Sequence, residues 1–134
     1  MSCVVVDTDV VSFLFKRDSR SELYRSHLVG NELIISFMTL AELYRWALVR
    51  NWGKPRKARL EAHLRSFAVH PFDVGLCRTW AEICHGAQSH GRPIATADAW
   101  IAATAVYHGL PLVTHNKSHY AGVPELKLVS ATGE

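Results

Sequence analysis

The chain has 134 residues, of which 49% are hydrophobic and 20% are charged, and its formal net charge is +3. That length is enough for one domain with a core and too short for two ordinary domains. The longest apolar stretches are shorter than a membrane span, no signal-peptide pattern opens the sequence, and three cysteines without regular spacing do not form a disulfide scaffold. We therefore expect a single domain over residues 1–134, located in the cytoplasm.

The first half of the chain alternates strand patterns with helix patterns. Apolar residues, most of them β-branched, follow one another at 3–6, which is typical of a strand buried on both faces. Thr8 or Asp9 is expected to cap the helix that follows this strand. The next predicted elements are, in order, a helix at 21–29, a strand at 33–36, and helices at about 39–51 and 55–67.

The second half continues the same alternation. The predicted elements are a short strand at 69–72, helices at 74–89 and from a capping Thr96 to about 107, and strands at 112–114 and 126–129. Strands that alternate with helices predict an α/β fold, here a three-layer α/β/α sandwich with a central parallel sheet of four to five strands. In such doubly wound sheets, ligands bind beyond the carboxyl ends of the strands.

Three acidic residues are predicted to lie at that edge of the sheet. Asp7 ends the first strand, Glu42 follows the second strand, and Asp98 lies in the first turn of the alanine-rich helix. Each one has a structural explanation: Asp7 can cap a helix, Glu42 can form a capping box with Thr39, and Asp98 favours a helix N-terminus. Helix capping does not explain why all three share one location. Clustered carboxylates repel one another, and a hard divalent ion such as Mg²⁺ or Mn²⁺ relieves that repulsion.

Four segments in the same order carry a resemblance to a known family. They are VVDTDV at 5–10, SFMTLAEL at 36–43, PIATADAWIAATA at 93–105 and GLPLVTHNKSHY at 109–120. With these segments the sequence resembles a PIN-domain ribonuclease, and more narrowly a VapC-type toxin of a bacterial toxin–antitoxin pair.

The resemblance implies a metal-dependent endoribonuclease in which Asp7, Glu42 and Asp98 bind Mg²⁺ or Mn²⁺. Asn116 stands where many relatives carry a fourth acid, so it either supplies a neutral oxygen or holds a water molecule. His119 stands where some relatives carry a further acid. The resemblance also implies a homodimer, an antitoxin partner that inhibits the enzyme, and RNA as the substrate.

Other residues are expected to support this chemistry. Thr8 and Thr114 can hydrogen-bond to the ligating carboxylates, although ordinary turn formation explains them equally well. Arg45, Arg92 and Lys117 are candidates for contacts with RNA phosphates. Basic residues are concentrated between positions 45 and 65, which favours a polyanionic partner, although a solvated helix face explains them as well.

Two other functions are consistent with parts of the sequence. Asp7-Thr8-Asp9 after a strand also resembles the nucleophile loop of haloacid-dehalogenase-like phosphatases, which would make Asp7 a covalent nucleophile. The later strands lack the acidic pair that this chemistry needs. The second alternative is a catalytically weak PIN-fold module that binds a partner or nucleic acid, and the neutral Asn116 favours it.

Overall fold

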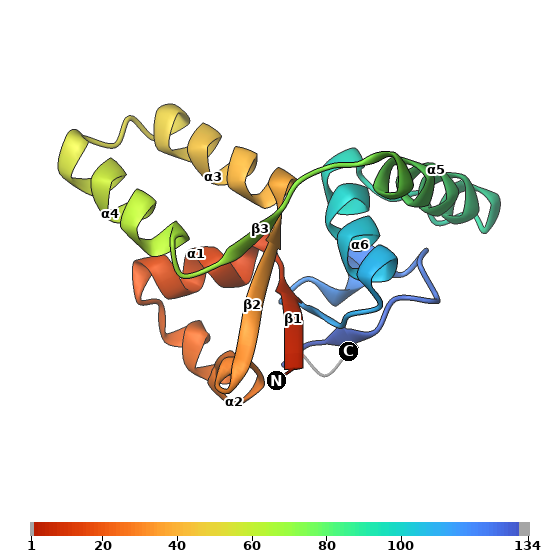
Figure 1. Cartoon of the computed structure of the whole chain (residues 1–134), viewed down its shortest axis with the longest axis horizontal. Coiled ribbons are helices and arrows are strands. Elements are labelled where there is room, and N and C mark those ends of the chain that lie inside the picture. The colour runs from red at the N-terminus through yellow and green to blue at the C-terminus, as the bar shows by residue number, and fades with distance from the viewer. Residues whose placement is uncertain (1, 132–134) are drawn as a thin grey trace.

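Strands and helices alternate along the chain in the computed structural model, which describes residues 2–131 (Figure 1). In chain order the elements are β1 (Ser2–Val6), α1 (Thr8–Lys16), the 3₁₀ helix η1 (Ser19–Tyr24), α2 (Arg25–Leu28), β2 (Asn31–Ser36), α3 (Phe37–Val49), α4 (Lys54–Leu64), β3 (Ala68–His70), α5 (Val74–Ser89), α6 (Thr96–His108), β4 (Leu112–Val113), the 3₁₀ helix η2 (Lys117–Tyr120) and β5 (Leu128–Val129).

The five strands form one parallel sheet in the order β3-β2-β1-β4-β5. The chain builds the sheet outward from β1 in one direction through β2 and β3, and then crosses back to add β4 on the other side of β1. The carboxyl ends of β1 and β4 therefore flank the point where the strand order reverses, which is where doubly wound sheets bind ligands.

Helices cover both faces of this sheet. Val4 and Val6 of β1 pack into an apolar cluster with residues of α1 to α4, whereas Val5 packs into a second cluster with residues of α5 and α6. Figure 1 shows the same division, with α1 to α4 on one side of the strands and α5 and α6 on the other. The alternation of side chains along a strand explains how one apolar run fills both cores. The predicted three-layer α/β/α sandwich is thus confirmed.

The starts of α3 and α6 differ from the predictions, whereas α1 is capped by Asp7, one of the predicted alternatives, and not by Thr8 or Asp9. Asp7 caps α1 by accepting a hydrogen bond from the backbone N–H of Thr8. Ser36, at the end of β2, caps α3 by accepting from the N–H of Met38 at 3.0 Å. The strand therefore runs directly into its helix, and the predicted capping box, with its cap three residues later, is wrong. The cap of α6 is an alanine whose side chain makes no capping bond, so the predicted Thr96 cap is also wrong.

Two short elements also differ from the predictions. The helix predicted at 21–29 is a 3₁₀ helix followed by the single turn of α2. Asp18 accepts a hydrogen bond from the N–H of Arg20 and starts that tighter helix. The strand β3 begins one residue earlier than predicted and ends two residues earlier, before Pro71, because proline has no N–H to continue the ladder. Among residues 2–131, no helix is long and apolar enough to cross a membrane.

Candidate active site

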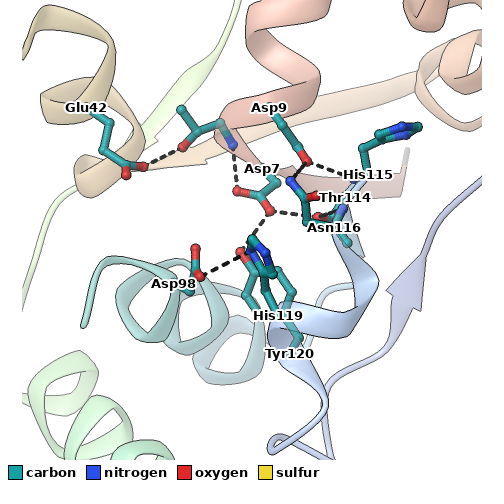
Figure 2. Close-up of polar contacts among 10 residues, drawn as sticks. Asp7, Asp9, Glu42, Asp98, Thr114, His115, Asn116, His119 and Tyr120 are labelled. Carbon is teal, nitrogen blue, oxygen red and sulfur yellow. Dashed lines mark hydrogen bonds and ion pairs between the residues drawn. The ribbon is translucent and has the colours of Figure 1, made fainter. Parts of the chain in front are cut away.

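A cavity of about 160 Å³ opens at the point where the strand order reverses. Asp7 directly follows β1, Glu42 projects from α3 and Asp98 from the first turn of α6 (Figure 2). The residues lining the cavity are Asp7, Thr8, Asp9, Glu42, Trp46, Asp98, Asn116 and His119. The fold thus brings together the three acids predicted from the sequence, although they lie 35 or more positions apart along the chain.

Asp7 is the most tightly held of these carboxylates. It is buried, and three donors bind it: the N–H of Thr8 at 2.7 Å to Oδ1, and the hydroxyls of Thr114 at 2.7 Å and Tyr120 at 2.8 Å to Oδ2. Burial raises the pKa of Asp7, and these hydrogen bonds oppose the rise. No basic side chain among the described residues forms an ion pair with it.

Asp9 is a fourth acid in the cavity, although the sequence predicted it only as a helix cap or as part of a phosphatase motif. Its Oδ2 accepts from the side-chain N–H of Asn116 at 2.7 Å and from the backbone N–H of His115 at 3.1 Å. Burial, and next the charge of Asp7, raise the pKa of Asp9 to about 7. Its position three residues after Val6, the last residue of β1, was the available signal for this location.

Glu42 and Asp98 approach the cavity from opposite helix layers. The Thr8 hydroxyl donates to Glu42 Oε1 at 2.8 Å, and this hydrogen bond takes the place of the capping bond predicted for Glu42. The same hydroxyl lies 2.9 Å from the buried Thr39 hydroxyl. Burial raises the pKa of Glu42 and of Asp98, and the charge of Asp7 adds to both shifts. His119 Nδ1 lies 3.5 Å from Asp98 Oδ2 and lowers the pKa of Asp98 in part.

These carboxylates form a negative site with little compensation by protein cations. Their raised pKa values mean that each proton lost from the site adds an unfavourable buried charge. Among residues 2–131, no group of three or more His, Cys, Asp or Glu side chains lies close enough together to hold a metal ion directly. Mg²⁺ commonly binds proteins through one or two carboxylates and keeps several waters. The oxygen donors and excess charge therefore fit a hydrated hard cation, and not an ion that needs a full protein cage.

The basic residues proposed for substrate contact lie outside the cavity wall. Arg45 on α3 and Arg92 in the loop before α6 are exposed, and Lys117 opens η2 beside Asn116. Their roles stay predictions. Trp46 does line the cavity. The guanidinium of Arg50 lies over its ring, 5.0 Å from the ring centre.

Two tyrosines near the site were not predicted. Tyr120 is buried beneath the cavity and donates to Asp7. The hydroxyl of Tyr24, also buried, lies 2.6 Å from Nδ1 of His115, whose backbone N–H binds Asp9. The sequence pattern around both tyrosines predicts that they are buried in the core. It does not predict which acceptor a buried tyrosine hydroxyl will bind.

Comparisons with known proteins agree with this geometry. The family model for the PIN domain matches residues 4–123. The chain is 35% identical over 125 residues to the VapC ribonuclease Y4jK of Sinorhizobium fredii, covering 87% of this chain and 89% of that protein. It is 31% identical over 125 residues to the toxin FitB of Neisseria gonorrhoeae, covering 87% and 90%. In fold it is similar to a crystal structure of VapBC2 from Rickettsia felis bound to a DNA fragment from their promoter, with a TM-score of 0.83, 21% identity, and coverage of 96% and 98%.

Proposed function

Because the chain belongs to the PIN-domain family and is of the VapC type, we propose that it is an endoribonuclease dependent on Mg²⁺ or Mn²⁺. In this proposal it acts as the toxin of a type II toxin–antitoxin pair. Relatives named as a ribonuclease and as a toxin, each more than 30% identical, support the ribonuclease activity and the toxin role. The family assignment leaves the phosphatase alternative without support.

One observation carries the proposal: four carboxylates line one small cavity at the switch point of the sheet, and histidine is their only basic neighbour in that lining. Carboxylates that serve only to stabilise a fold are ordinarily exposed or paired with a cation. Here hydroxyl and amide donors orient the carboxylates without neutralising them. The arrangement leaves negative charge available to a cation from solution.

Asp7, Asp98 and Glu42 are the residues that would hold the ion, directly or through water, and Asp9 adds charge on the side of α1. A bound divalent ion supplies Lewis-acid activation of a phosphodiester and lowers the pKa of water. In this proposal Asn116 presents neutral polar groups at the rim, where its amide N–H already fixes Asp9.

Glu42 is suited to orient the attacking water or to accept its proton. The hydroxyl of Thr8 binds Oε1, and no donor among residues 2–131 binds Oε2, so this oxygen of a cavity-lining residue keeps its acceptor positions. The burial that raises the pKa of Glu42 also makes it a stronger base, and a general base works best when its pKa approaches the working pH. In this scheme Thr8 fixes the direction from which Glu42 acts.

RNA reaches this site along a basic surface. Arg45, Arg92 and Lys117 would neutralise backbone phosphates, and exposed loops or single strands are the form of RNA whose backbone can enter so small a cavity. A toxin also needs an inhibitor, and we propose an antitoxin partner together with a homodimeric toxin. Size-exclusion chromatography with light scattering, with and without the product of a neighbouring reading frame, tests both assemblies.

RNA cleavage by antitoxin-free protein tests the central proposal. We expect cleavage with Mg²⁺ or Mn²⁺, no cleavage with a chelator, and loss of cleavage in Asp7→Asn. The amide keeps an oxygen for the N–H of Thr8 and can donate to the neighbouring hydroxyls, so that variant should fold. Inactivity of the wild type with both ions, together with unchanged RNA binding in the variant, would instead favour a binding module.

A further inference from the structure

Tyr120 connects the apolar core to the acidic cavity. It ends η2, its ring belongs to the cluster that packs against α5 and α6, and only 1% of its surface is exposed. Its hydroxyl donates to Oδ2 of Asp7 at 2.8 Å (Figure 2). A phenylalanine would fill the same volume without placing a hydroxyl in an apolar environment, where it is costly unless bonded. The hydroxyl is therefore best explained by its acceptor, Asp7.

The hydrogen bonds of Asp7 leave its two oxygens unequal. An ionised carboxylate has about four acceptor positions, two on each oxygen. Thr114 and Tyr120 occupy both positions of Oδ2, since the Thr114 hydroxyl itself accepts from the N–H of Asn116 and so directs its proton to Asp7. The N–H of Thr8 occupies one position of Oδ1. Among residues 2–131, no other donor reaches Oδ1, so it keeps one position.

From this count we propose that Tyr120 is a positioning residue: its hydroxyl fixes the Asp7 carboxylate so that only Oδ1 is offered to a cation in the cavity. The inference rests on the proposed function, because it concerns the same site. Tyr120 does not line the cavity, so it acts through the carboxylates: its hydroxyl donates to Asp7, and its side chain also lowers the pKa of Asp98 in part. Asp7 is also the cap of α1, so the same hydroxyl fixes the start of this helix relative to the cation site.

This role separates Tyr120 from a residue that contacts RNA. Its ring is enclosed by the core and offers no face on which a base could stack. Removing the hydroxyl should therefore weaken cation binding and slow the chemical step while leaving the affinity for RNA unchanged. Loss of an outer hydrogen-bond partner of a metal ligand commonly costs about 10- to 100-fold in metal affinity or activity.

The test is the variant Tyr120→Phe, which removes one oxygen atom and keeps the ring. The matched control is Tyr107→Phe, because the Tyr107 hydroxyl lies 3.3 Å from Asp73 and away from the cavity. Mn²⁺ titrations followed by electron paramagnetic resonance give the dissociation constant without any need for activity. We expect about 10- to 100-fold weaker Mn²⁺ binding for Tyr120→Phe and wild-type binding for the control. Kinetics should show a lower kcat and an unchanged KM for RNA.

Circular dichroism and the thermal midpoint confirm that each variant is folded before it is titrated. Wild-type Mn²⁺ affinity in folded Tyr120→Phe would overturn the inference. A changed KM with an unchanged kcat would also overturn it, because that pattern belongs to substrate contact. Asp7→Asn separates this result from failure of the proposed function. If Asp7→Asn loses Mn²⁺ while Tyr120→Phe does not, only the role of Tyr120 is wrong. If wild-type protein neither binds Mn²⁺ nor cleaves RNA, the proposed function fails as well.

Discussion

Replacing Asp9 by asparagine should make the metal-free protein less sensitive to pH. In the native state burial and the neighbouring Asp7 raise the pKa of Asp9 from its ordinary 3.8 to about 7. Between these values the native protein keeps a proton that the unfolded chain has lost. The free energy of unfolding must therefore fall as the pH rises toward 7, because the native state binds more protons in that window.

The size of the effect follows from the shift. The pKa of Asp9 is about 7 in the native state and 3.8 in the unfolded state. Between about pH 5 and pH 8, this difference lowers the free energy of unfolding by at most about 2.6 kcal/mol. The Asp9 side chain is only partly buried, and solvent screening reduces that bound. We expect Asp9 to account for about 1 to 2.5 kcal/mol of lost stability over this range. The asparagine variant should lose correspondingly less, because it has no charge to bury.

Urea unfolding followed by tryptophan fluorescence, at both pH values and with a chelator present, measures this difference. The control is Asp18→Asn, in which the removed acid is partly exposed and its hydrogen bonds with Arg20 lower its pKa to about 2. Asp18 is ionised in both states throughout the range, so its removal should shift stability equally at both pH values. Identical pH dependence in wild type and Asp9→Asn would refute the assignment of a raised pKa to Asp9. Adding Mn²⁺ to the wild type at the higher pH should restore stability by mass action.

Three further outcomes are expected. Glu42→Gln keeps an oxygen acceptor for Thr8, so its free energy of unfolding should stay within about 1 kcal/mol of wild type. The rate of RNA cleavage should fall at least about 100-fold. Full activity in this variant would exclude Glu42 from catalysis. Gly109→Ala should cost about 1 kcal/mol in urea unfolding, because Gly109 ends α6 with φ at 66°, where a Cβ is disfavoured. Arg45→Glu should weaken RNA binding and reduce its salt dependence, measured by fluorescence anisotropy at several salt concentrations; an unchanged salt slope would remove Arg45 from the RNA surface.

The sheet and the position of the acids could be predicted because both follow from simple rules. Apolar runs such as 3–6 identify strands buried on both faces, and parallel topology brings their carboxyl ends to one edge. That rule is sufficient to place Asp7 and Glu42 near each other. Asp98 was predicted at the same edge although its own segment follows no predicted strand directly, and the resemblance to PIN domains then implied a metal-binding role for it. The cavity contains all three.

The remaining features depend on distances that no local pattern encodes. Ser36 was predicted to end a strand, yet it also caps α3, because the strand and helix join without a loop. Glu42 matched a capping box, yet its partner Thr8 lies 34 positions away. Tyr120 looks like an ordinary core residue until the fold sets its hydroxyl beside Asp7. For Glu42 and Tyr120 the deciding hydrogen bond is tertiary, whereas the Ser36 cap is a local bond to Met38 that the sequence allows as readily as the predicted Thr39 cap.

The way the carboxylates are stabilised distinguishes a functional site from a structural one. A buried carboxylate that only stabilises a fold is best served by a cation, because the pair removes net charge from the interior. Asp7 instead receives three uncharged donors, and Asp9 receives backbone and amide N–H groups. Such donors fix orientation but leave the negative charge in place, at a cost that grows as the pH rises. This loss of stability is explained if the negative charge serves a function. Removing an acid from this cavity should therefore increase the free energy of unfolding and weaken cation binding.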